Sequence, residues 1–328
     1  MKIFVSRSFP GTALDSLKSS GHEVTISPFD RPLTAEELLV HAKGVDGLLS
    51  FLTDKIDGEV LDALGPQLKI VSNYAVGFDN IVVPEATNRG IVVSNTPCDE
   101  VNEAVAEHTW ALLLSLARRV VEADESTKRG AYHGWEPGIF LGASLKGKTL
   151  GIIGMGRIGE MVARRAKGFE MKVLYNKRTP DPKAESELGV TFASVDDLLA
   201  QSDFVSLHAP LTDETRHMMN HDRFSKMKNG SYLINTARGP MVDEYALVEA
   251  LRTGKLAGAG LDVFDAEPNM NPELVGMENV ILTPHIASAT YEAREKMGRL
   301  AVDAILQTLT SQQPQTIVNP DVWDHRRV

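Results

Sequence analysis

The chain has 328 residues, which is long enough for two domains that each bury a hydrophobic core. Hydrophobic residues make up 43% of it, no apolar run is long enough to span a membrane, and its start resembles a strand rather than a signal peptide. A net charge of −10 disfavours nucleic acid as a partner, because phosphates would be repelled. The single cysteine, Cys98, excludes an internal disulfide and fits a reducing compartment, so a cytoplasmic location is expected.

The first 98 residues alternate short apolar strands with helical segments, which predicts a parallel α/β sheet. Thr34 and Glu37 have the spacing of a capping box, and residues 73–80 (N-Y-A-V-G-F-D-N) form a loop after a predicted strand, where parallel sheets bind ligands. Strands are expected at 2–6, 23–26, 47–49, 68–72 and 91–93, and helices at 12–19, 34–42 and 58–64.

Residues 95–97 are typical of a crossing between domains, and one long helix is expected from Val101 to about Lys128. The glycine-rich loop 130–147, which carries Trp135, is assigned no chemistry. The α/β alternation then resumes, and a C-terminal tail at 315–319 is expected to return to the first domain. Strands are expected at 204–207, 232–235, 259–263 and 280–282, and helices at 195–200, 244–253 and about 289–310.

A glycine motif between a strand and a helix predicts a dinucleotide site. Gly154, Gly156 and Gly159 form G-x-G-x-x-G after a buried strand at 149–153, and an amphipathic helix and a strand at 171–175 complete a βαβ unit. One glycine permits the tight turn, one lets the backbone approach a pyrophosphate, and one lets helix and strand pack closely. Free N–H groups at the helix start would bind the anion. A glycine-rich turn that serves packing alone is the alternative.

The end of the second strand lacks the acidic residue that usually binds the ribose 2′-hydroxyl of NAD. Asn176, Lys177, Arg178 and Thr179 stand there instead. A carboxylate would repel a 2′-phosphate, whereas a guanidinium can bind one through paired hydrogen bonds. The sequence therefore favours NADPH over NADH, and a solvated basic loop is the alternative.

Three segments that follow predicted strands of the second domain each carry one useful ionisable group: Arg238, Glu267 and His285. All three are expected at one edge of the sheet. Reduction of a carbonyl by hydride needs a cation to polarise the carbonyl, an acid to protonate the alkoxide, and a carboxylate to keep that acid charged. Each residue alone has an ordinary structural explanation, but together they favour this chemistry.

The order and spacing of five motifs resemble the D-isomer-specific 2-hydroxyacid dehydrogenases, and within them the glyoxylate/hydroxypyruvate reductase branch. The resemblance covers nearly the whole chain. It implies an α/β fold of two Rossmann-like or flavodoxin-like domains with parallel sheets, in which a dinucleotide domain (99–288) is inserted into a substrate, or lid, domain (1–98 and 289–328), with the active site in the cleft. The motifs are G-M-G-R-I-G (154–159), H-A-P-L-T (208–212), N-T-A-R-G (235–239), L-D-V-F-D-A-E-P (261–268) and P-H-I-A-S (284–288).

The resemblance also assigns roles to individual residues. His285 would be the acid/base, Glu267 its partner and Arg238 the group that holds a 2-oxo acid, while the amides of Val76 and Gly77 would bind the substrate carboxylate. The expected cofactor contacts are Gly154, Gly156, Arg157, Ile158, Gly159, Asn176, Lys177, Arg178, Thr179, His208, Pro210, Thr215, Thr236, Ala237, Asp262 and Ala287. No metal is assigned.

These residues predict NADPH-dependent reduction, with NADH as the alternative cofactor, of glyoxylate and hydroxypyruvate to glycolate and D-glycerate. A homodimer with the helix 101–128 in its interface is also expected. Phosphite-oxidising relatives carry lysine where Val76 stands, and formate dehydrogenases carry glutamine in place of Glu267, so both are disfavoured. Phosphoglycerate dehydrogenases typically carry arginine where Asn73 stands, which weakens that function without excluding it. A cofactor-sensing corepressor of the same fold is the alternative from another class, and a turnover assay would separate it from an enzyme.

Overall fold

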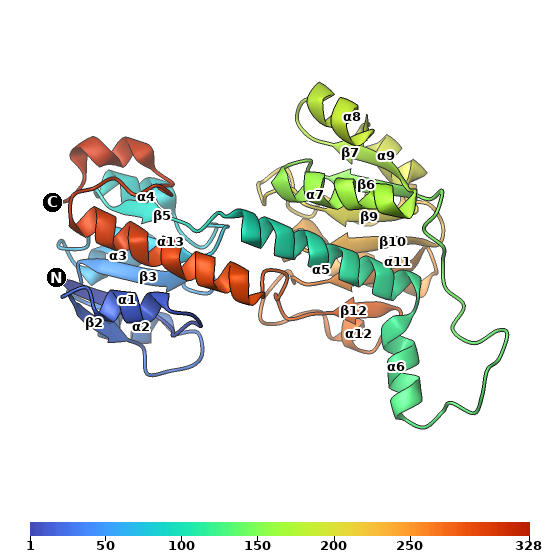
Figure 1. Ribbon diagram of the computed structural model, residues 1–328, viewed down its shortest axis with the longest axis horizontal. Coiled ribbons are helices and arrows are strands. Elements are labelled where there is room, and N and C mark those ends of the chain that lie inside the picture. Colours follow the sequence, from blue (N-terminus) through green and yellow to red (C-terminus); the bar gives the residue numbers. More distant parts are fainter. The chain divides into compact units, whose positions relative to one another are not determined.

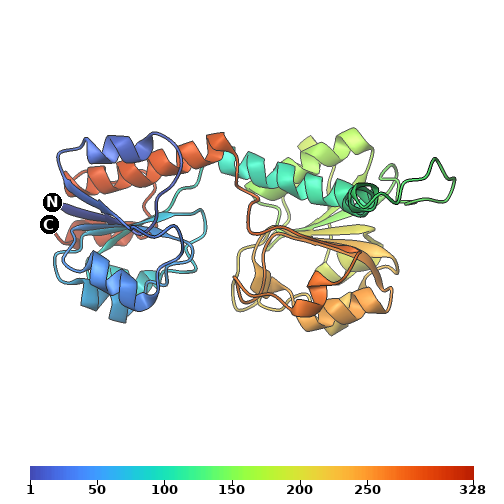
Figure 2. The same ribbon diagram turned by 90° about the horizontal axis from the view of Figure 1, so that it is seen from below.

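The computed structural model describes residues 1–328, and the chain divides into two compact units. Unit 1 comprises residues 1–101 and 289–328, and unit 2 comprises residues 102–288. Each unit is a parallel sheet with helices on both of its faces (Figure 1 and Figure 2), which confirms the predicted α/β class. No helix of the chain combines the length and the apolar character that crossing a bilayer requires.

Unit 1 is built on a five-stranded sheet in the order β2-β1-β3-β4-β5. Helices α1 (Ala13–Lys18) and α13 (Tyr291–Leu309) pack together on one face, and α2 (Ala35–Ala42), α3 (Gly58–Leu64) and α4 (Val83–Asn88) cover the other (Figure 2). All five predicted strands are present, with ends within two residues of the prediction; they are β1 (Lys2–Val5), β2 (Glu23–Ile26), β3 (Gly47–Phe51), β4 (Ile70–Tyr74) and β5 (Val92–Ser94). The capping box of Thr34 and Glu37 is confirmed. Helix α4 was not predicted, because it buries only Ala86.

The C-terminal tail completes unit 1, as the sequence predicts. The Val318 N–H donates to Val93 O over 2.8 Å, and the Asn319 side chain accepts a hydrogen bond from the Val93 N–H over 2.8 Å. The Asn319 amide also donates to Ile91 O over 3.0 Å. A final 3-10 helix, η3 (Pro320–His325), follows. The tail is therefore hydrogen-bonded to the edge strand β5.

Unit 2 is built on a seven-stranded parallel sheet in the order β12-β11-β10-β9-β6-β7-β8. Its first strand in the chain, β6, lies between β9 and β7, and such a reversal of strand order is where open α/β sheets bind ligands. The strands are β6 (Thr149–Ile153), β7 (Lys172–Asn176), β8 (Thr191–Phe192), β9 (Phe204–Leu207), β10 (Ser231–Asn235), β11 (Leu256–Leu261) and β12 (Val280–Leu282). The helices are α5 (Asp99–Ala117), α7 (Arg157–Ala166) and α8 (Pro182–Leu188) on one face, and α9 (Val195–Gln201), α10 (His221–Lys226), α11 (Glu244–Arg252) and α12 (Pro272–Val275) on the other.

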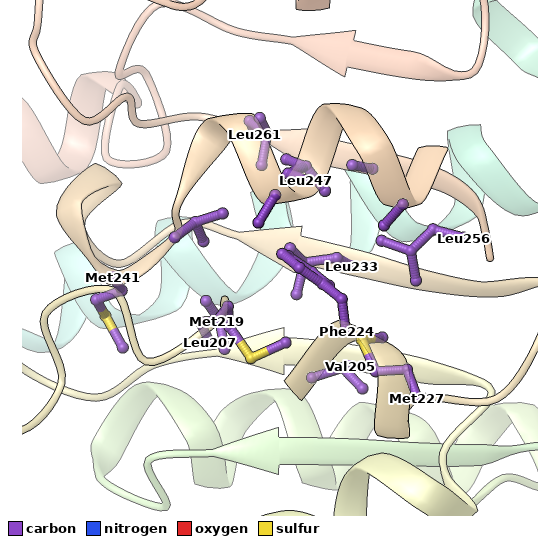
Figure 3. Close-up of a cluster of buried hydrophobic side chains, with 14 of the residues drawn as sticks. Val205, Leu207, Met219, Phe224, Met227, Leu233, Met241, Leu247, Leu256 and Leu261 are labelled. Carbon is purple, nitrogen blue, oxygen red and sulfur yellow. The ribbon is translucent and has the colours of Figure 1, made fainter. Parts of the chain in front are cut away.

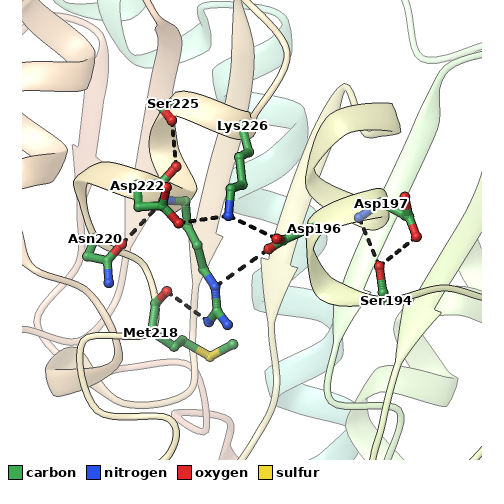
Figure 4. Close-up of polar contacts among 9 residues, drawn as sticks. Ser194, Asp196, Asp197, Met218, Asn220, Asp222, Ser225 and Lys226 are labelled. Atoms are coloured by element: carbon green, nitrogen blue, oxygen red, sulfur yellow. Dashed lines mark hydrogen bonds and ion pairs between the residues drawn. The ribbon is translucent and has the colours of Figure 1, made fainter.

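A core of aliphatic side chains, methionines and Phe224 joins β9, β10 and β11 to the helices on one face (Figure 3). Burial of each large side chain contributes about 1.5–3 kcal/mol. At the surface, Lys226 of α10 contacts Asp196 of α9 at 2.9 Å and Asp222 at 2.7 Å (Figure 4). Exposed ion pairs contribute at most about 1 kcal/mol each, so the apolar core decides how these helices pack.

The prediction of one helix from Val101 to Lys128 is wrong. Helix α5 ends at Ala117, and α6 (Val120–Lys128) starts after Arg119, whose backbone has the left-handed φ of 51°. Apolar residues continue across this break, so the periodicity did not reveal it. The segment 130–147 then runs as a long loop beyond the sheet and helices of unit 2 (Figure 1). The short elements α8, β8, α10 and α12 were not predicted either.

Candidate active site

Three adjacent strands of unit 2 place Arg238, Glu267 and His285 at one edge of the sheet. Strands β10, β11 and β12 are parallel neighbours that end at Asn235, Leu261 and Leu282. Each of the three residues lies in the loop that directly follows its strand. Residues that are far apart in the sequence thus meet at the carboxyl edge, where parallel sheets carry their ligand sites.

His285 and Glu267 form a hydrogen-bonded pair. The imidazole Nδ1 lies 2.9 Å from Glu267 Oε2, and the two side chains are 28% and 29% exposed. The other carboxylate oxygen, Oε1, accepts a hydrogen bond from the Phe264 N–H over 3.0 Å. A carboxylate on Nδ1 fixes the proton at that nitrogen and leaves Nε2 as the atom that can exchange a proton with a ligand.

The backbone of His285 is held by Asp262. Residue 285 adopts the left-handed φ of 54°, and its N–H donates to Asp262 O over 2.8 Å. The amides of Ile286 and Ala287 donate to the fully buried Asp262 carboxylate over 2.9 and 2.8 Å. Burial raises the pKa of Asp262, yet the hydrogen bonds that it accepts outweigh burial and keep the pKa below its usual value. Asp262 therefore stays an anion that fixes the His285 turn.

Two further members of this network were missed by the sequence analysis. Thr283 Oγ1 donates to Asp262 over 2.6 Å, and the Nε2 atom of His108, on α5, lies 3.0 Å from the same hydroxyl. A histidine inside a long helix and a threonine before a proline carry no sequence signal for such a role.

Arg238 lies in a tight turn that is closed by Asn235. The Asn235 amide donates to Arg238 O over 2.9 Å and its carbonyl accepts from the Ala237 N–H over 3.0 Å. Arg238 Nη1 donates to Ala237 O over 2.7 Å. Gly239 follows, and a Cβ there would lie 1.8 Å from Phe264 O. Only glycine lets the turn of Arg238 approach the loop after β11 this closely.

The three glycines at the start of α7 differ in what surrounds them. Gly154 has a φ of 101°, and a Cβ there would lie 2.3 Å from Ala209 N. A Cβ on Gly159 would lie 2.4 Å from Gly154 O, so this glycine permits close packing of helix and turn. Gly156, the N-cap of α7, has no atom within 4 Å of its Cβ position. Open space beside the helix start, next to Arg157 and Ile158, is what a pyrophosphate bound against the backbone requires.

The two basic side chains of the loop after β7 differ in their contacts. Asn176 donates to Ala193 O over 2.9 Å, and Lys177 Nζ forms an ion pair with Asp181 at 2.8 Å. Arg178 and Thr179 are exposed. A hydrogen bond from the Thr212 side chain lowers the pKa of Glu214, and the nearby charge of Arg178 lowers it further. Lys177 is therefore already occupied by an ion pair, whereas the exposed Arg178 guanidinium is accessible to an anionic ligand.

The loop after β9 carries His208, Pro210 and Thr215. His208 is half-buried, and desolvation lowers its pKa to about 4, so the ring is neutral near pH 7. Its Nε2 lies 2.8 Å from Ser206 Oγ. Thr215 Oγ1 donates to Pro210 O over 2.8 Å and accepts from the Thr212 N–H, which closes this loop.

Thr236 and Ala287 direct their polar groups into unit 2. Thr236 is buried, and its hydroxyl lies 2.9 Å from that of Thr109. The Ala287 N–H is bound by Asp262. The Ala287 N–H is therefore not available to a ligand, whereas the Thr236 hydroxyl, although bonded to Thr109, keeps the capacity to accept a hydrogen bond.

In unit 1, two asparagine side chains hold the loop of Val76 and Gly77, which follows β4. The fully buried Asn73 donates to Gly77 O over 3.0 Å, and Asn95 donates to Val76 O over 2.7 Å. Both carbonyls are thus bound, and no backbone carbonyl of unit 1 accepts a hydrogen bond from the N–H group of Val76 or Gly77. This arrangement presents two adjacent donors, the geometry that suits a carboxylate.

A cavity of about 370 Å³ in unit 2 contains none of these residues. It lies towards the starts of β10 and β11, and its lining includes Arg119, Glu122 and Tyr232. The chain contains no group of three or more His, Cys, Asp or Glu side chains that could hold a metal ion.

Residues 110–287 match the family model described as the NAD-binding domain of the D-isomer specific 2-hydroxyacid dehydrogenases. A glyoxylate reductase from Thermococcus kodakarensis is 48% identical, with 99% of this chain and 98% of that protein covered. The crystal structure of a protein from Thermus thermophilus is 45% identical and superposes with a TM-score of 0.90, covering 97% of this chain and 100% of the other.

A second solved structure is an NADPH-dependent glyoxylate/hydroxypyruvate reductase from Sinorhizobium meliloti in complex with NADP and malonate. It is 34% identical, has a TM-score of 0.86, and covers 100% of this chain and 98% of the other. The matches to the two reductases and to the Thermus thermophilus protein extend over both units. The chain therefore belongs to the D-isomer specific 2-hydroxyacid dehydrogenase family, in its glyoxylate reductase branch.

Proposed function

We propose that this protein reduces glyoxylate and hydroxypyruvate to glycolate and D-glycerate, with NADPH as the preferred cofactor. The observation that carries the proposal is the hydrogen-bonded pair of His285 and Glu267 at the same sheet edge as Arg238. The names of the similar proteins, which include glyoxylate reductases and an NADPH-dependent glyoxylate/hydroxypyruvate reductase, support the substrate and the cofactor.

The residues at the start of α7 fit a dinucleotide. The open space beside Gly156 accepts a pyrophosphate against the N–H groups of Arg157 and Ile158, and the exposed Arg178 offers a guanidinium to a 2′-phosphate. The bound cofactor supplies the hydride that the carbonyl carbon receives. The remaining groups of the site need only bind the substrate and supply one proton.

The proton comes from His285. Arg238 binds the 2-oxo acid and stabilises the negative charge that grows on the carbonyl oxygen. His285 donates the Nε2 proton to that oxygen, so that hydride and proton together convert the carbonyl to an alcohol. Glu267 accepts the Nδ1–H hydrogen bond and stabilises the charged imidazole that the step requires.

The substrate carboxylate is bound by the two amides of Val76 and Gly77. The asparagines that hold this loop, Asn73 and Asn95, carry no charge. Nothing on the loop after β4 would therefore offset the desolvation of a second, phosphate-borne charge on the substrate. This favours small 2-oxo acids with a single carboxylate over 3-phosphohydroxypyruvate.

We also propose that the protein is a homodimer in which α6 and the loop 130–147 form part of the interface. These segments expose large apolar side chains: Val120 is 51% exposed, Tyr132 61%, Trp135 82% and Leu141 69%. Large exposed apolar side chains are typical of an interface, and their burial would offset the cost of association.

Steady-state rates on glyoxylate, hydroxypyruvate, pyruvate, phenylpyruvate and 3-phosphohydroxypyruvate test the substrate. We expect the highest kcat/KM for glyoxylate and hydroxypyruvate, because these substrates need only one binding site for a carboxylate and one for the carbonyl. A clear preference for the phosphorylated acid would assign the protein to phosphoglycerate dehydrogenation instead. The absence of turnover on every acid would favour a cofactor-sensing protein.

The Arg178→Ala variant tests the cofactor. We expect it to lower kcat/KM with NADPH and to leave NADH nearly unaffected, because a charge-assisted paired contact contributes about 1.5–3 kcal/mol, or one to two decades. Arg164→Ala, at an exposed arginine of α7, is the matched control. An unchanged NADPH/NADH ratio in Arg178→Ala would mean that the loop is merely solvated.

The pH dependence of kcat/KM tests the acid/base pair. Reduction needs the protonated imidazole, so activity should fall as pH rises, and Glu267→Gln should move this fall to lower pH because the anion that favours the charged ring is lost. Glu267→Gln should keep part of the activity, whereas His285→Ala should lose about 10²–10⁴-fold. If the pH profile of Glu267→Gln is the same as that of the wild-type protein, the two side chains do not act together.

Sedimentation equilibrium at micromolar concentration tests the assembly. We expect a mass of twice the 35.8 kDa of one chain. Val120→Lys on α6 should shift the protein towards the monomer, because it places a charge in the proposed interface. Val40→Lys, which is on the exposed face of α2 in unit 1, should not. A monomeric wild-type protein would overturn the proposal.

A further inference from the structure

Glu244 is a buried acidic residue with no role in the chemistry proposed above. It lies in the first turn of α11, and its side chain belongs to the interior of unit 2. Its Oε1 atom accepts a hydrogen bond from the Asp265 N–H over 2.9 Å, and its Oε2 atom accepts one from the Asn271 N–H over 2.7 Å. Both partners are backbone amides. A buried carboxylate is costly unless it is hydrogen-bonded, so these two contacts hold it firmly.

The two amides bracket the loop that carries Glu267. Asp265 and Asn271 stand at the two ends of this loop, and the Asn269 N–H closes it internally on Ala266 O over 2.9 Å. Within the loop, Glu267 reaches His285 Nδ1 at 2.9 Å. One carboxylate thus fixes both ends of the segment whose middle holds the partner of the imidazole.

We propose that Glu244 is a positioning residue for the acid/base pair. It sets the place of the Glu267 backbone and thereby the length of the hydrogen bond between Glu267 and His285. The inference rests on the proposed function where it concerns catalysis, but the hydrogen bond itself can be measured in the absence of turnover. An acidic residue in a first helical turn also stabilises its helix by about twofold to fivefold in the folding equilibrium, which is the competing structural role.

Among the other charged groups near the pair, only Asp265 lies on the loop that Glu244 holds; it contacts His217 at 3.4 Å. Asp262, which holds the turn of His285, His108 beside Asp262, and Arg238 belong to neighbouring loops and to α5. Glu244→Gln preserves side-chain volume but replaces one acceptor oxygen with an amide that cannot accept the backbone N–H. Any change in the pH profile would then come from the loop of Glu267.

Kinetics of Glu244→Gln, Glu267→Gln and the double variant provide the first test. Glu244→Gln should lower kcat/KM for glyoxylate about tenfold, which is the effect of losing one hydrogen bond to a charged group. It should also shift the pH at which kcat/KM falls in the same direction as Glu267→Gln does. The double variant should be no worse than Glu267→Gln alone, because both changes act on one hydrogen bond. Glu249→Gln, at an exposed position of the same helix, should change neither quantity.

Proton NMR of the cofactor-free protein provides the second test. The hydrogen-bonded Nδ1 proton of His285 should give a downfield resonance, which is assigned by its absence in His285→Ala. Glu244→Gln should shift or broaden this resonance, and Glu249→Gln should leave it unchanged. If the wild-type protein reduces none of the acids, the proposed function fails, while this resonance still decides the inference. A Glu244→Gln variant that is less stable to urea but has the wild-type resonance and pH profile would show a structural role only. Should Glu244→Gln not fold, Glu244→Asp, which keeps the charge but shortens its reach, is subject to the same criteria.

Discussion

The candidate active site depends on one buried anion, the carboxylate of Asp262. Removal of this group from water is unfavourable, and the structure offsets that cost with donors from Thr283, Ile286 and Ala287. These donors come from the turn that carries His285, so the anion and the turn hold each other in place. The left-handed backbone of His285 persists because this network outweighs its strain.

The sheet adds a second constraint, because it fixes the order of three loops. Strands β10, β11 and β12 pair in parallel, and their carboxyl ends deliver the turn of Arg238, the loop of Glu267 and the turn of His285 in that order. Gly239 lets the first loop touch the second, and Glu267 joins the second to the third. Buried carboxylates hold the loop of Glu267 and the turn of His285, whereas Asn235 and Gly239 hold the turn of Arg238.

Residues with a periodic or motif signal could be predicted from the sequence, and residues whose role depends on tertiary contacts could not. The strands, other than the two-residue β8, and the glycine turn of α7 were found because their patterns are local. The break at Arg119 was missed because apolar residues continue through it. Glu244 and His108 carry no signal either, since an acidic residue at a helix start and a histidine within a helix are ordinary.

Each unit holds its own part of the proposed site through hydrogen bonds within that unit, so a substitution in one unit leaves the hydrogen bonds of the other part in place. Asn73 and Asn95 hold the Val76–Gly77 loop through contacts made wholly within residues 1–101, whereas Asp262, Glu267 and His285 are bound to one another within residues 102–288. In the proposed mechanism, the loop that the two asparagines hold binds the 2-oxo acid substrate. The network of Asp262, Glu267 and His285 supplies the proton. A substitution in the Val76–Gly77 loop therefore alters the proposed substrate site while the hydrogen bonds that hold the proton donor stay in place.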